Sequence, residues 1–498
     1  MKRWYILWGF IFFILSESYS QTENLFFEVG LLGGVTTGNT VPFWLRSNQF
    51  GNIPLDKTSF SVIAAAGKNY DTTRNRVFDW AISAKARLNT GYKLNLILIE
   101  ANAKIKGGIF EFSAGRSREI MGLCDTLLSS GSWSISGNAL GIPKIQIAIP
   151  EYYSIPWFGK LFAFKGQYAH GWVGDVTMNR PMFIELTPDT IENKTYFHQK
   201  SLYGRLGKPH WKFKLYAGFN HQVFWGNEKV YYGDKYTLTP LQTYYYVVVG
   251  KPYINPEIPT SSKIGNHLGS IDMGAEYTFK NIRVLLYRQN FYDVGNLYYL
   301  TNIRDGLNGI SITNLNQTEK AFSLKKIVFE FLYTKSQGGQ PGAKETPTPF
   351  EQYYNNGQYI DGWSYQGEGL GTPFITSKFY VRGDLPVHPR TYFANNRVIA
   401  YHLGISGSIY KWEYQIKASY SRNFGTYYTT DEEQSTGIRN PGEVGIFGEQ
   451  GQFSSYFYLN RGLPSDFSLG CLFAFDVGTL LYNSFGLFIT VSKSFNTH

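Results

Sequence analysis

The chain of 498 residues has few cysteines, few charges and no long apolar run after its first residues, and each scarcity narrows the class of protein. Its two cysteines, Cys124 and Cys471, lie far apart, so they cannot form a disulfide framework or a Cys-rich zinc site. We interpret them as separate thiols, with one long-range disulfide as the alternative. Beyond about residue 20, nothing is apolar over the length of a membrane-spanning helix, which argues against a helical membrane protein.

Catalytic and cofactor motifs are also missing. The sequence has no G-x-S-x-G, no H-E-x-x-H and no phosphate-binding glycine loop. Its eight histidines are scattered without ligand spacing, so we predict no metal site and no cofactor. Asp361 with Glu368, or the acids at 431–433, could form a glycosidase pair, but paired carboxylates are common by chance and carry little weight. We expect a protein that is not an enzyme and, because basic and acidic residues are interleaved, does not bind nucleic acid.

The N-terminus has the anatomy of a secretory signal peptide. The basic pair Lys2–Arg3 precedes the apolar run Trp4–Leu15, and the small residues Ser18 and Ser20 precede a cleavage site before Gln21. A short membrane anchor is the alternative, but the apolar run is short for a bilayer span. We expect the mature chain to begin near Gln21 and to be exported, with a net charge of +9 instead of +10.

Aromatic residues and glycine are abundant, with 38 Tyr, 38 Phe, 11 Trp and 52 Gly. Aromatic side chains favour strands, and glycines suit turns and tight corners. Several segments alternate apolar and polar residues, among them 80–89, 412–421, 467–477 and 481–495. In the last of these, Leu487 and Ile489 share one face while Ser492 lies on the other. This period of two predicts strands that each have one apolar face.

Such strands fit a secreted sandwich or an outer-membrane barrel, and we predict the barrel. The strands are many and long, and aromatic residues such as Trp412 and Phe495 stand near strand ends, as in interfacial girdles. At roughly 25–28 residues for each strand with its loop, the mature chain predicts about 16–18 antiparallel strands. The predicted fold class is therefore an all-β, transmembrane barrel in the outer membrane.

We divide the chain into the signal peptide at 1–20, an irregular segment at 21–78 and the barrel with long loops at 79–498. The irregular segment is rich in Gly, Thr and Asn and is a candidate periplasmic or plug part. A barrel of this kind has outer-membrane lipid and the barrel-insertion machinery as partners, and we expect it to be a monomer.

Four segments break the alternation, at 136–172, 197–226, 265–311 and 354–374, and together with 42–51 and 395–408 they carry a resemblance. Most of it lies in "SGNALGIPKIQIAIPEY" (136–152), "GNHLG" (265–269), "NIRDGLNG" (302–309) and "GWSYQGEGLGTPF" (362–374). In content and order they resemble the Wzi family of capsule assembly proteins. The resemblance implies an outer-membrane barrel of roughly 18 strands that acts as a lectin and helps to hold capsular polysaccharide or exopolysaccharide on the cell surface. A member of that family can carry a helical plug.

The candidate polysaccharide-binding residues lie mostly in these irregular segments. Sugars stack on aromatic rings and accept hydrogen bonds from planar groups. Arginine adds affinity for acidic sugars, and the positive net charge suits an anionic polymer. We predict that the following residues contribute to one such site: His170, Trp172, His221, Trp225, Arg288, Arg304, Trp363 and Tyr365.

Each candidate has a structural alternative. An aromatic residue can belong to a girdle or a packed core, and Arg304 beside Asp305 can clamp a turn. The stretch 354–374 can be an inward-folded loop that constricts the lumen instead of a surface that receives sugar. Two other functions also stay open: a channel for solutes or glycans, and a surface enzyme that acts on glycan or lipid.

Overall fold

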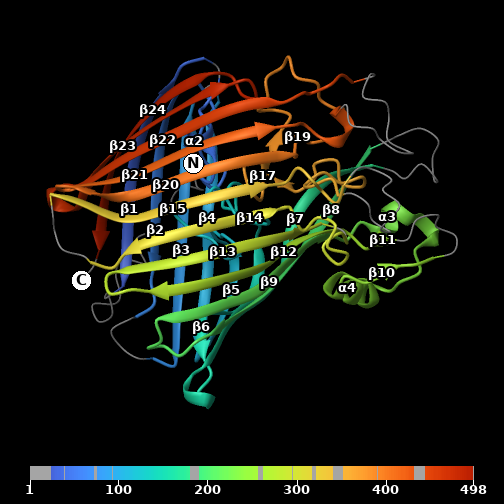
Figure 1. Ribbon diagram of the computed structural model, residues 1–498, viewed down its shortest axis with the longest axis horizontal. Helices are drawn as coiled ribbons and strands as arrows, with labels where there is room; N and C mark the ends of the chain where they lie inside the picture. The colour runs from blue at the N-terminus through green and yellow to red at the C-terminus, as the bar shows by residue number, and fades with distance from the viewer. Residues whose placement is uncertain are drawn as a thin grey trace, which may run out of the picture.

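The computed structural model describes residues 24–38, 40–71, 76–91, 93–179, 190–255, 262–293, 295–316, 321–339, 351–389, 391–430 and 444–496. Eighteen strands form one antiparallel sheet (Figure 1). Its first strand, β1 (Leu25–Thr36), pairs with its last, β24 (Ser484–Asn496), so the sheet closes into a barrel. The predicted barrel is confirmed, at the upper end of the predicted strand number. The predicted signal peptide lies outside the described residues.

The wall strands pair with their neighbours in chain order. Between β1 and β24 they are β2 (Thr58–Lys68), β3 (Phe78–Thr90), β4 (Asn95–Gly107), β5 (Phe110–Arg116), β6 (Lys144–Ser154), β7 (Phe162–Asn179), β8 (Thr190–Leu206), β9 (Phe213–Trp225), β12 (Asn266–Thr278), β13 (Ile282–Tyr292), β14 (Gly306–Asn314), β15 (Phe322–Tyr333), β20 (Val398–Ile409), β21 (Trp412–Asn423), β22 (Gln450–Gly462) and β23 (Phe467–Gly478).

Short elements occupy the connections. The helices are α2 (Phe43–Arg46), α3 (Glu228–Tyr232) and α4 (Pro240–Val249), with 3-10 turns η1 (Trp157–Gly159), η2 (Gly233–Lys235), η3 (Tyr427–Thr429) and η5 (Pro464–Asp466). Three small hairpins pair β10 (Pro252–Tyr253) with β11 (Ser262–Lys263), β16 (Ser364–Tyr365) with β17 (Glu368–Gly369), and β18 (Thr376–Ser377) with β19 (Phe393–Asn395). In the part of the chain that the structure describes, no helix is long and apolar enough to cross a membrane.

The two faces of the wall follow the alternation in the sequence. On β24, Phe485 and Ile489 are 44% and 47% exposed, whereas Phe488 between them is 1% exposed. Trp80 and Ile82 on β3 are likewise exposed, while Arg87 on the same strand is buried in the lumen. An apolar outer face around a polar interior is the arrangement of a barrel in lipid. The protein lies in the outer membrane.

Short and long connections separate to opposite ends of the barrel. Two-residue and three-residue turns, such as 108–109 and 279–281, join strands at the end where β1 begins and β24 ends. The long connections 37–57, 117–143, 226–265 and 334–397 all leave the opposite end. Outer-membrane barrels place short turns in the periplasm and long loops outside the cell. The long-loop end is therefore the cell-surface end.

The described residues of three long loops fold back into the lumen, and we call them the plug: 37–38 with 40–57, 117–143, and 351–389 with 391–397. Their buried residues join inward-facing wall residues in one apolar cluster. The side chain of Trp133 in the second loop stacks on Phe291 of the wall, with ring centroids 4.1 Å apart. The third loop contacts the second through the hydroxyl of Tyr354, which donates to the carbonyl of Trp133. The lumen is thus occupied by loop residues that pack as a core.

Glycine permits the closest approach within the plug. A Cβ atom on Gly371 would lie 1.9 Å from both the carbonyl oxygen of Trp133 and the hydroxyl oxygen of Tyr354. Any side chain at this position would have to separate the second loop from the third. Gly362, Gly369 and Gly371 therefore serve packing inside the barrel, whereas Gly367 lies in open space.

The structure corrects the prediction of an irregular segment at 21–78. Most of that segment forms the full-length wall strands β1 and β2, and the barrel begins at Leu25. Its glycines, among them Gly30 and Gly34, face neighbouring strands at close range, and Phe488 occupies the space beside Gly34. In β1 the apolar residues Phe26 and Leu32 alternate with the outward Phe27 and Leu31, and β2 has alanines on both faces, so the alternation in both strands is weak. The described residues between β1 and β2 enter the plug from the long-loop end.

Candidate functional site

At the cell-surface end, the plug leaves an open groove between its first and third loops, and we call it the mouth groove. It consists of two adjoining cavities of about 400 and 380 Å³ that share Arg46, Leu55, Gln366 and Glu368. The first cavity also reaches Phe379, Tyr380 and Tyr482, and the second reaches Asn89, Lys93 and Asn95. The groove therefore combines aromatic, amide, carboxylate and cationic side chains from four loops and the adjoining strand ends.

A small hairpin carries one side of the groove. Its strands β16 and β17 are joined by Gln366 and Gly367, both in the left-handed region with φ of 53° and 85°. Two residues with positive φ make the turn type that matches the twist of a hairpin, and glycine adopts it without strain. The turn holds the Gln366 side chain exposed at the groove while Tyr365, one residue earlier, is buried. The hairpin turn thus places Gln366 in the groove and Tyr365 in the plug.

Arg46, at the end of α2, carries positive charge into the groove. Its guanidinium carbon lies 3.5 Å from the ring centroid of Tyr380, and the Tyr380 hydroxyl donates to the carboxylate of Glu368. Burial raises the pKa of Glu368, although Arg46 and the Tyr380 hydroxyl oppose the shift. The three side chains support one another, so a planar cation and a carboxylate are presented in fixed positions. Both groups form directional hydrogen bonds with hydroxyls.

Two exposed rings border the same groove. Phe379 is 69% exposed and packs edge-on against Tyr392, with ring centroids 5.6 Å apart. Tyr482 is 46% exposed, and its hydroxyl accepts a hydrogen bond from the backbone N–H of Gly383 at 3.0 Å. Each ring is held by its neighbours while a large part of its surface stays open. Such rings are platforms for the apolar C–H faces of sugars.

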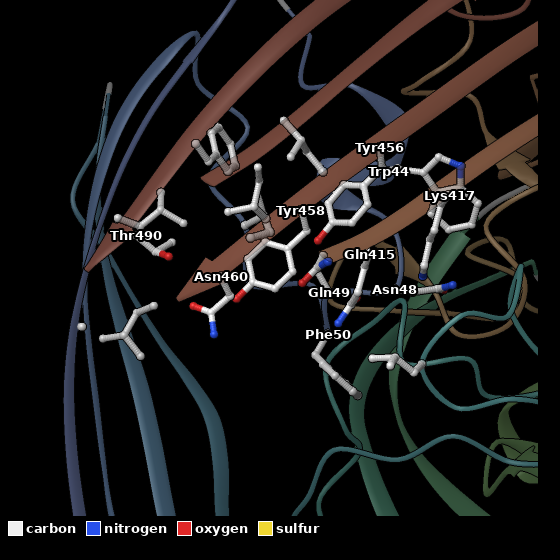
Figure 2. Close-up of a pocket in the computed structure, with 18 of the residues that line it drawn as sticks. Trp44, Asn48, Gln49, Phe50, Gln415, Lys417, Tyr456, Tyr458, Asn460 and Thr490 are labelled. Carbon is white, nitrogen blue, oxygen red and sulfur yellow. The ribbon is translucent and has the colours of Figure 1, made fainter. Parts of the chain in front are cut away.

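A separate cavity of about 470 Å³ lies deeper, in the short-turn half of the lumen (Figure 2). Tyr456 and Tyr458 of β22 point into it from the wall, and Gln49 and Phe50 approach from the first plug loop. Its other polar side chains come from neighbouring strands and from the plug: Asn48, Lys85, Arg87, Gln415, Lys417, Asn460, Thr490 and Ser492. We call it the luminal cavity.

The helix α2 and the residues after it separate the luminal cavity from the mouth groove. Trp44 lines the luminal cavity, where the ammonium of Lys417 lies 4.7 Å from its ring centroid. Arg46, two residues later, lines the mouth groove. Ile53 borders both spaces. The backbone N–H of Phe43 donates to the carboxylate of Asp476 at 2.8 Å, which fastens the helix to the wall.

The predicted site residues do not come together in one site, which corrects the expectation that they would. Trp363 and Tyr365 are buried in the plug. The ring of Trp363 stacks on Phe224 at 4.5 Å, and its N–H donates to the carbonyl of Ser134 at 2.8 Å. Tyr365 accepts a hydrogen bond from Arg116 at 2.8 Å. The stretch 354–374 therefore folds inward, which was the alternative to a sugar-binding surface, and both rings pack inside the lumen.

Four other predicted residues gather on the outer side of the wall. The ring of His170 lies 5.2 Å from that of Trp172 and 5.8 Å from that of Trp225. His221, on the same face of β9 as Trp225, is hydrogen-bonded to His267 at 2.9 Å. The segment after β9 covers part of this cluster, so these residues face lipid or protein and not the mouth groove.

The two predicted arginines lie at the loop between β13 and β14. Arg288 donates to Asn290, to Asn308 and to the carbonyl of Ile303, at 2.7, 2.6 and 2.5 Å, so it holds this loop against the wall. Arg304 is exposed in the same loop. Its neighbour Asp305 is buried and accepts from the backbone N–H groups of two residues of the next loop. Asp305, not Arg304, is therefore the clamp of this turn.

The mouth-groove residues were not predicted, except that Glu368 was weighed as an acid. Arg46 and Gln366 are separated by more than 300 positions, and no local period marks either. The signal that could have found Gln366 is the dipeptide Gln366–Gly367 between short flanking strands, which is a hairpin pattern. The cysteines are both free, with Cys124 in the second plug loop and Cys471 on β23.

No model of a known protein family matches the chain, and no curated protein matches its sequence. Among solved structures, it is similar to Wzi, an outer membrane protein involved in group 1 capsule assembly in Escherichia coli and a carbohydrate binding beta-barrel. The TM-score is 0.54 at 11% identity, over 99% of this chain and 88% of that one.

Two other solved barrels match over comparable lengths. OccAB2 of Acinetobacter baumannii gives a TM-score of 0.45 at 10% identity, over 96% of this chain and 99% of its own. OccAB4 of the same organism gives 0.43 at 9% identity, over 96% and 100%. At this level of identity, the likeness to Wzi shows the barrel fold alone.

Proposed function

We propose that this outer-membrane barrel binds a polysaccharide in the mouth groove and holds it at the cell surface without catalysis. The observation that carries the proposal is the groove itself. It opens at the cell-surface end and joins the exposed rings of Phe379 and Tyr482 to the planar groups of Arg46, Gln366 and Glu368. Aromatic platforms beside fixed amide, carboxylate and guanidinium groups suit sugar rings with their apolar faces and hydroxyls.

The packed plug supports a binder over a channel. An 18-stranded barrel without a plug would leave a wide lumen. Here buried aromatic side chains of the plug, including Trp133, Tyr354 and Trp363, pack against the wall inside the lumen, and α2 separates the mouth groove from the luminal cavity. A passage for glycan would require this core to open. The channel that the sequence left as an alternative is therefore less well supported than binding at the mouth.

Two further features agree with a polymer as the ligand. The sequence segments quoted above resemble those of capsule assembly proteins, and the similar structure of Wzi is described as carbohydrate binding. The positive net charge of +10 for the full chain favours polymers that carry carboxylates. A polymer that repeats its sugar unit can also return to the groove after each release, so weak single contacts suffice for retention.

The test compares groove variants with a matched control. Phe379→Ala removes an exposed ring and Gln366→Ala an exposed amide, and neither side chain is buried in the plug. Tyr298→Ala is the control, because Tyr298 is an 86% exposed ring on another long loop. Binding is measured with polysaccharide extracted from the cells that make the protein, with dextran as the unrelated polymer, on folded protein in detergent.

Each groove substitution is expected to weaken binding roughly fivefold, which corresponds to about 1 kcal/mol for one stacking or hydrogen-bonding contact. The double variant is expected to lose more, and Tyr298→Ala to bind as wild type does. Equal binding by the double variant and the wild type would refute the groove. Steady conductance of the wild type in planar bilayers would instead favour the channel.

A further inference from the structure

The segment between β9 and β12 lies on the outer side of the barrel and not in its lumen. Its buried residues Tyr232, Tyr236, Val247 and Ile264 form a core with Val223 of β9. Val223 faces outward, because the next residue, Phe224, stacks on Trp363 inside the lumen. The helix α4 therefore packs against the outer wall, beside β10 and β11 at the long-loop end (Figure 1).

The helix is well defined and carries no charge. Thr239 and Gln242 form a capping box at its start, and Gly250, with φ of 67°, ends it. Thr243 and Val247 are buried against the wall. On the opposite face, Leu241, Tyr245 and Val249 are 78%, 57% and 51% exposed, and their spacing of four residues aligns them in one stripe. The outward face of α4 is thus apolar and without a covering element among the described residues.

The height of α4 on the wall follows from β9. Its outward residues Phe213, Leu215 and Phe219 are 48%, 40% and 37% exposed, and the strand starts at the short-turn end. A tilted strand crosses the hydrocarbon in roughly 9–11 residues, so a crossing that starts near Phe213 ends near Val223. Val223 is the residue that packs under the segment of α4. The helix therefore stands at the upper edge of the lipid-facing band.

The wall beneath α4 is unusual because it turns polar side chains outward. His170, His198, His221 and His267 lie on four neighbouring strands, and His198 and His267 both pair with Val223 in register. The hydroxyl of Tyr244 on α4 is hydrogen-bonded to that of Tyr168 at 2.8 Å, and its ring lies 5.9 Å from that of His198. Polar groups that face hydrocarbon without partners are costly. The helix covers them at the level where lipid would reach them.

The helix α4 also covers Lys200, an outward-facing charged residue. Lys200 lies opposite His221 on the outward face of β8, and its ammonium donates to the carbonyl of Val248 near the end of α4. The C-terminal end of a helix carries partial negative charge, so it is a favourable partner for an ammonium. This contact fastens the helix end to the wall and keeps the lysine charge out of the lipid.

An apolar groove connects the helix with the lipid-facing wall. It has a volume of about 540 Å³ and runs from Ile105, Phe112, Ile145 and Ile147 of the wall to Tyr244 of α4. Ile145 and Phe112 are 53% and 56% exposed on the outer face, as lipid-facing residues are. The surface that meets lipid thus continues without a break from the strands to the helix.

We infer that α4 is an interfacial anchor whose stripe of Leu241, Tyr245 and Val249 lies in the outer leaflet, with lipid chains filling the groove beneath Tyr244. The continuity of the helix with the lipid-facing wall selects lipid as the occupant. Tyrosines 244–246 suit the boundary between hydrocarbon and headgroups, where aromatic residues gather. Lys229 and Lys251 are exposed beside the helix, at the level of anionic headgroups. The inference is independent of the proposed polysaccharide binding.

The test places a nitroxide on the stripe of the full-length barrel. Leu241→Cys and Tyr245→Cys are made in a Cys471→Ser background, with the unsubstituted background as the label blank. The protein is reconstituted in vesicles of phosphatidylethanolamine and phosphatidylglycerol. Collisions with oxygen, which dissolves in lipid, are compared with collisions with a water-soluble nickel chelate. Ile489→Cys reports the lipid-facing wall and Tyr298→Cys reports water.

Both stripe positions are expected to resemble Ile489→Cys, with oxygen contact exceeding nickel contact. Values that resemble Tyr298→Cys at both positions would overturn the inference, since pure lipid vesicles contain no protein partner. In intact cells, a photo-crosslinking residue in place of Tyr245 is expected to give a lipid adduct. A protein adduct in its place would assign the stripe to a partner and would also overturn the inference.

Discussion

Trp363 is the residue whose substitution tests the plug most directly. Its side chain is fully buried, stacks on Phe224 at 4.5 Å and donates a hydrogen bond to Ser134 at 2.8 Å. Trp363→Ala is expected to destabilise the plug by about 3–5 kcal/mol, as large-to-small changes of buried tryptophan do. Trp363→Phe keeps an aromatic ring but leaves the Ser134 carbonyl without its donor, which costs roughly 1–3 kcal/mol. The wall ladder is untouched in both variants.

The assay is limited trypsin proteolysis of the folded barrel in detergent, read at Arg118 and Lys378, which lie in two different plug loops. Cleavage of a transiently opened loop follows the population of its open form. Trp363→Ala is therefore expected to be cleaved roughly 150-fold to 5,000-fold faster, and Trp363→Phe is expected to show a smaller increase. Heat-modifiable migration on gels checks that the barrel itself stays closed.

Phe379→Ala is the matched control, because Phe379 is an aromatic residue of the same loop that is 69% exposed. It is expected to leave the cleavage rate at Arg118 unchanged while weakening polysaccharide binding. A Trp363→Ala protein that resists trypsin like the wild type but no longer binds polysaccharide would refute this reasoning. Trp363 would then be a sugar contact, as the sequence suggested.

The remaining predictions concern the wall, the loops and the N-terminus. Ile489→Lys places a charge on the lipid face and should impair assembly by about 2–4 kcal/mol, whereas Ser492→Lys in the lumen should assemble normally in a vesicle-insertion assay. Burial raises the pKa of Asp305 from its ordinary 3.8 to about 7. The neutral form of Asp305 is therefore favoured in the folded loop. In hydrogen exchange, protection of the two backbone amides that Asp305 binds should be greatest below pH 4 and should fall as the pH rises to 7. Asp305→Asn should remove this dependence on pH. Gly371→Ala should cost roughly 1–3 kcal/mol by overpacking and increase trypsin cleavage of the plug. The N-terminal sequence of the protein from outer membranes should begin near Gln21, and a protein that still begins with Met1 would refute the predicted signal peptide.

The wall could be predicted because its pattern is local. In β24, Phe485, Ile489, Val491 and Phe495 are exposed on the outer face, as the alternation predicted, and Phe488 is an aromatic residue on the lumen side. Alternation with period two and the need for closure set the fold class and nearly the strand number. The same reasoning failed for β1 and β2, because in β1 apolar residues such as Leu32 also face the lumen, and in β2 alanines stand on both faces.

The loops could not be predicted in the same way. Trp363 and Phe379 are aromatic residues of one glycine-rich loop, yet one is fully buried and the other is 69% exposed. An aromatic ring can fill the lumen or stack on a sugar, so the residue type does not distinguish the two roles. Which of them is exposed depends on the second plug loop, more than 200 positions earlier in the chain, and no local pattern records that distance.

The sequence by itself determined an exported barrel with an apolar outer face, because hydrophobic periodicity and strand length are properties of short segments. The tertiary structure alone decided which loops enter the lumen, where Arg46 meets Gln366 at the mouth, and why α4 lies on the wall. These arrangements depend on contacts between residues far apart in the chain, and they form only once the eighteen strands have closed and fixed the loop ends in space.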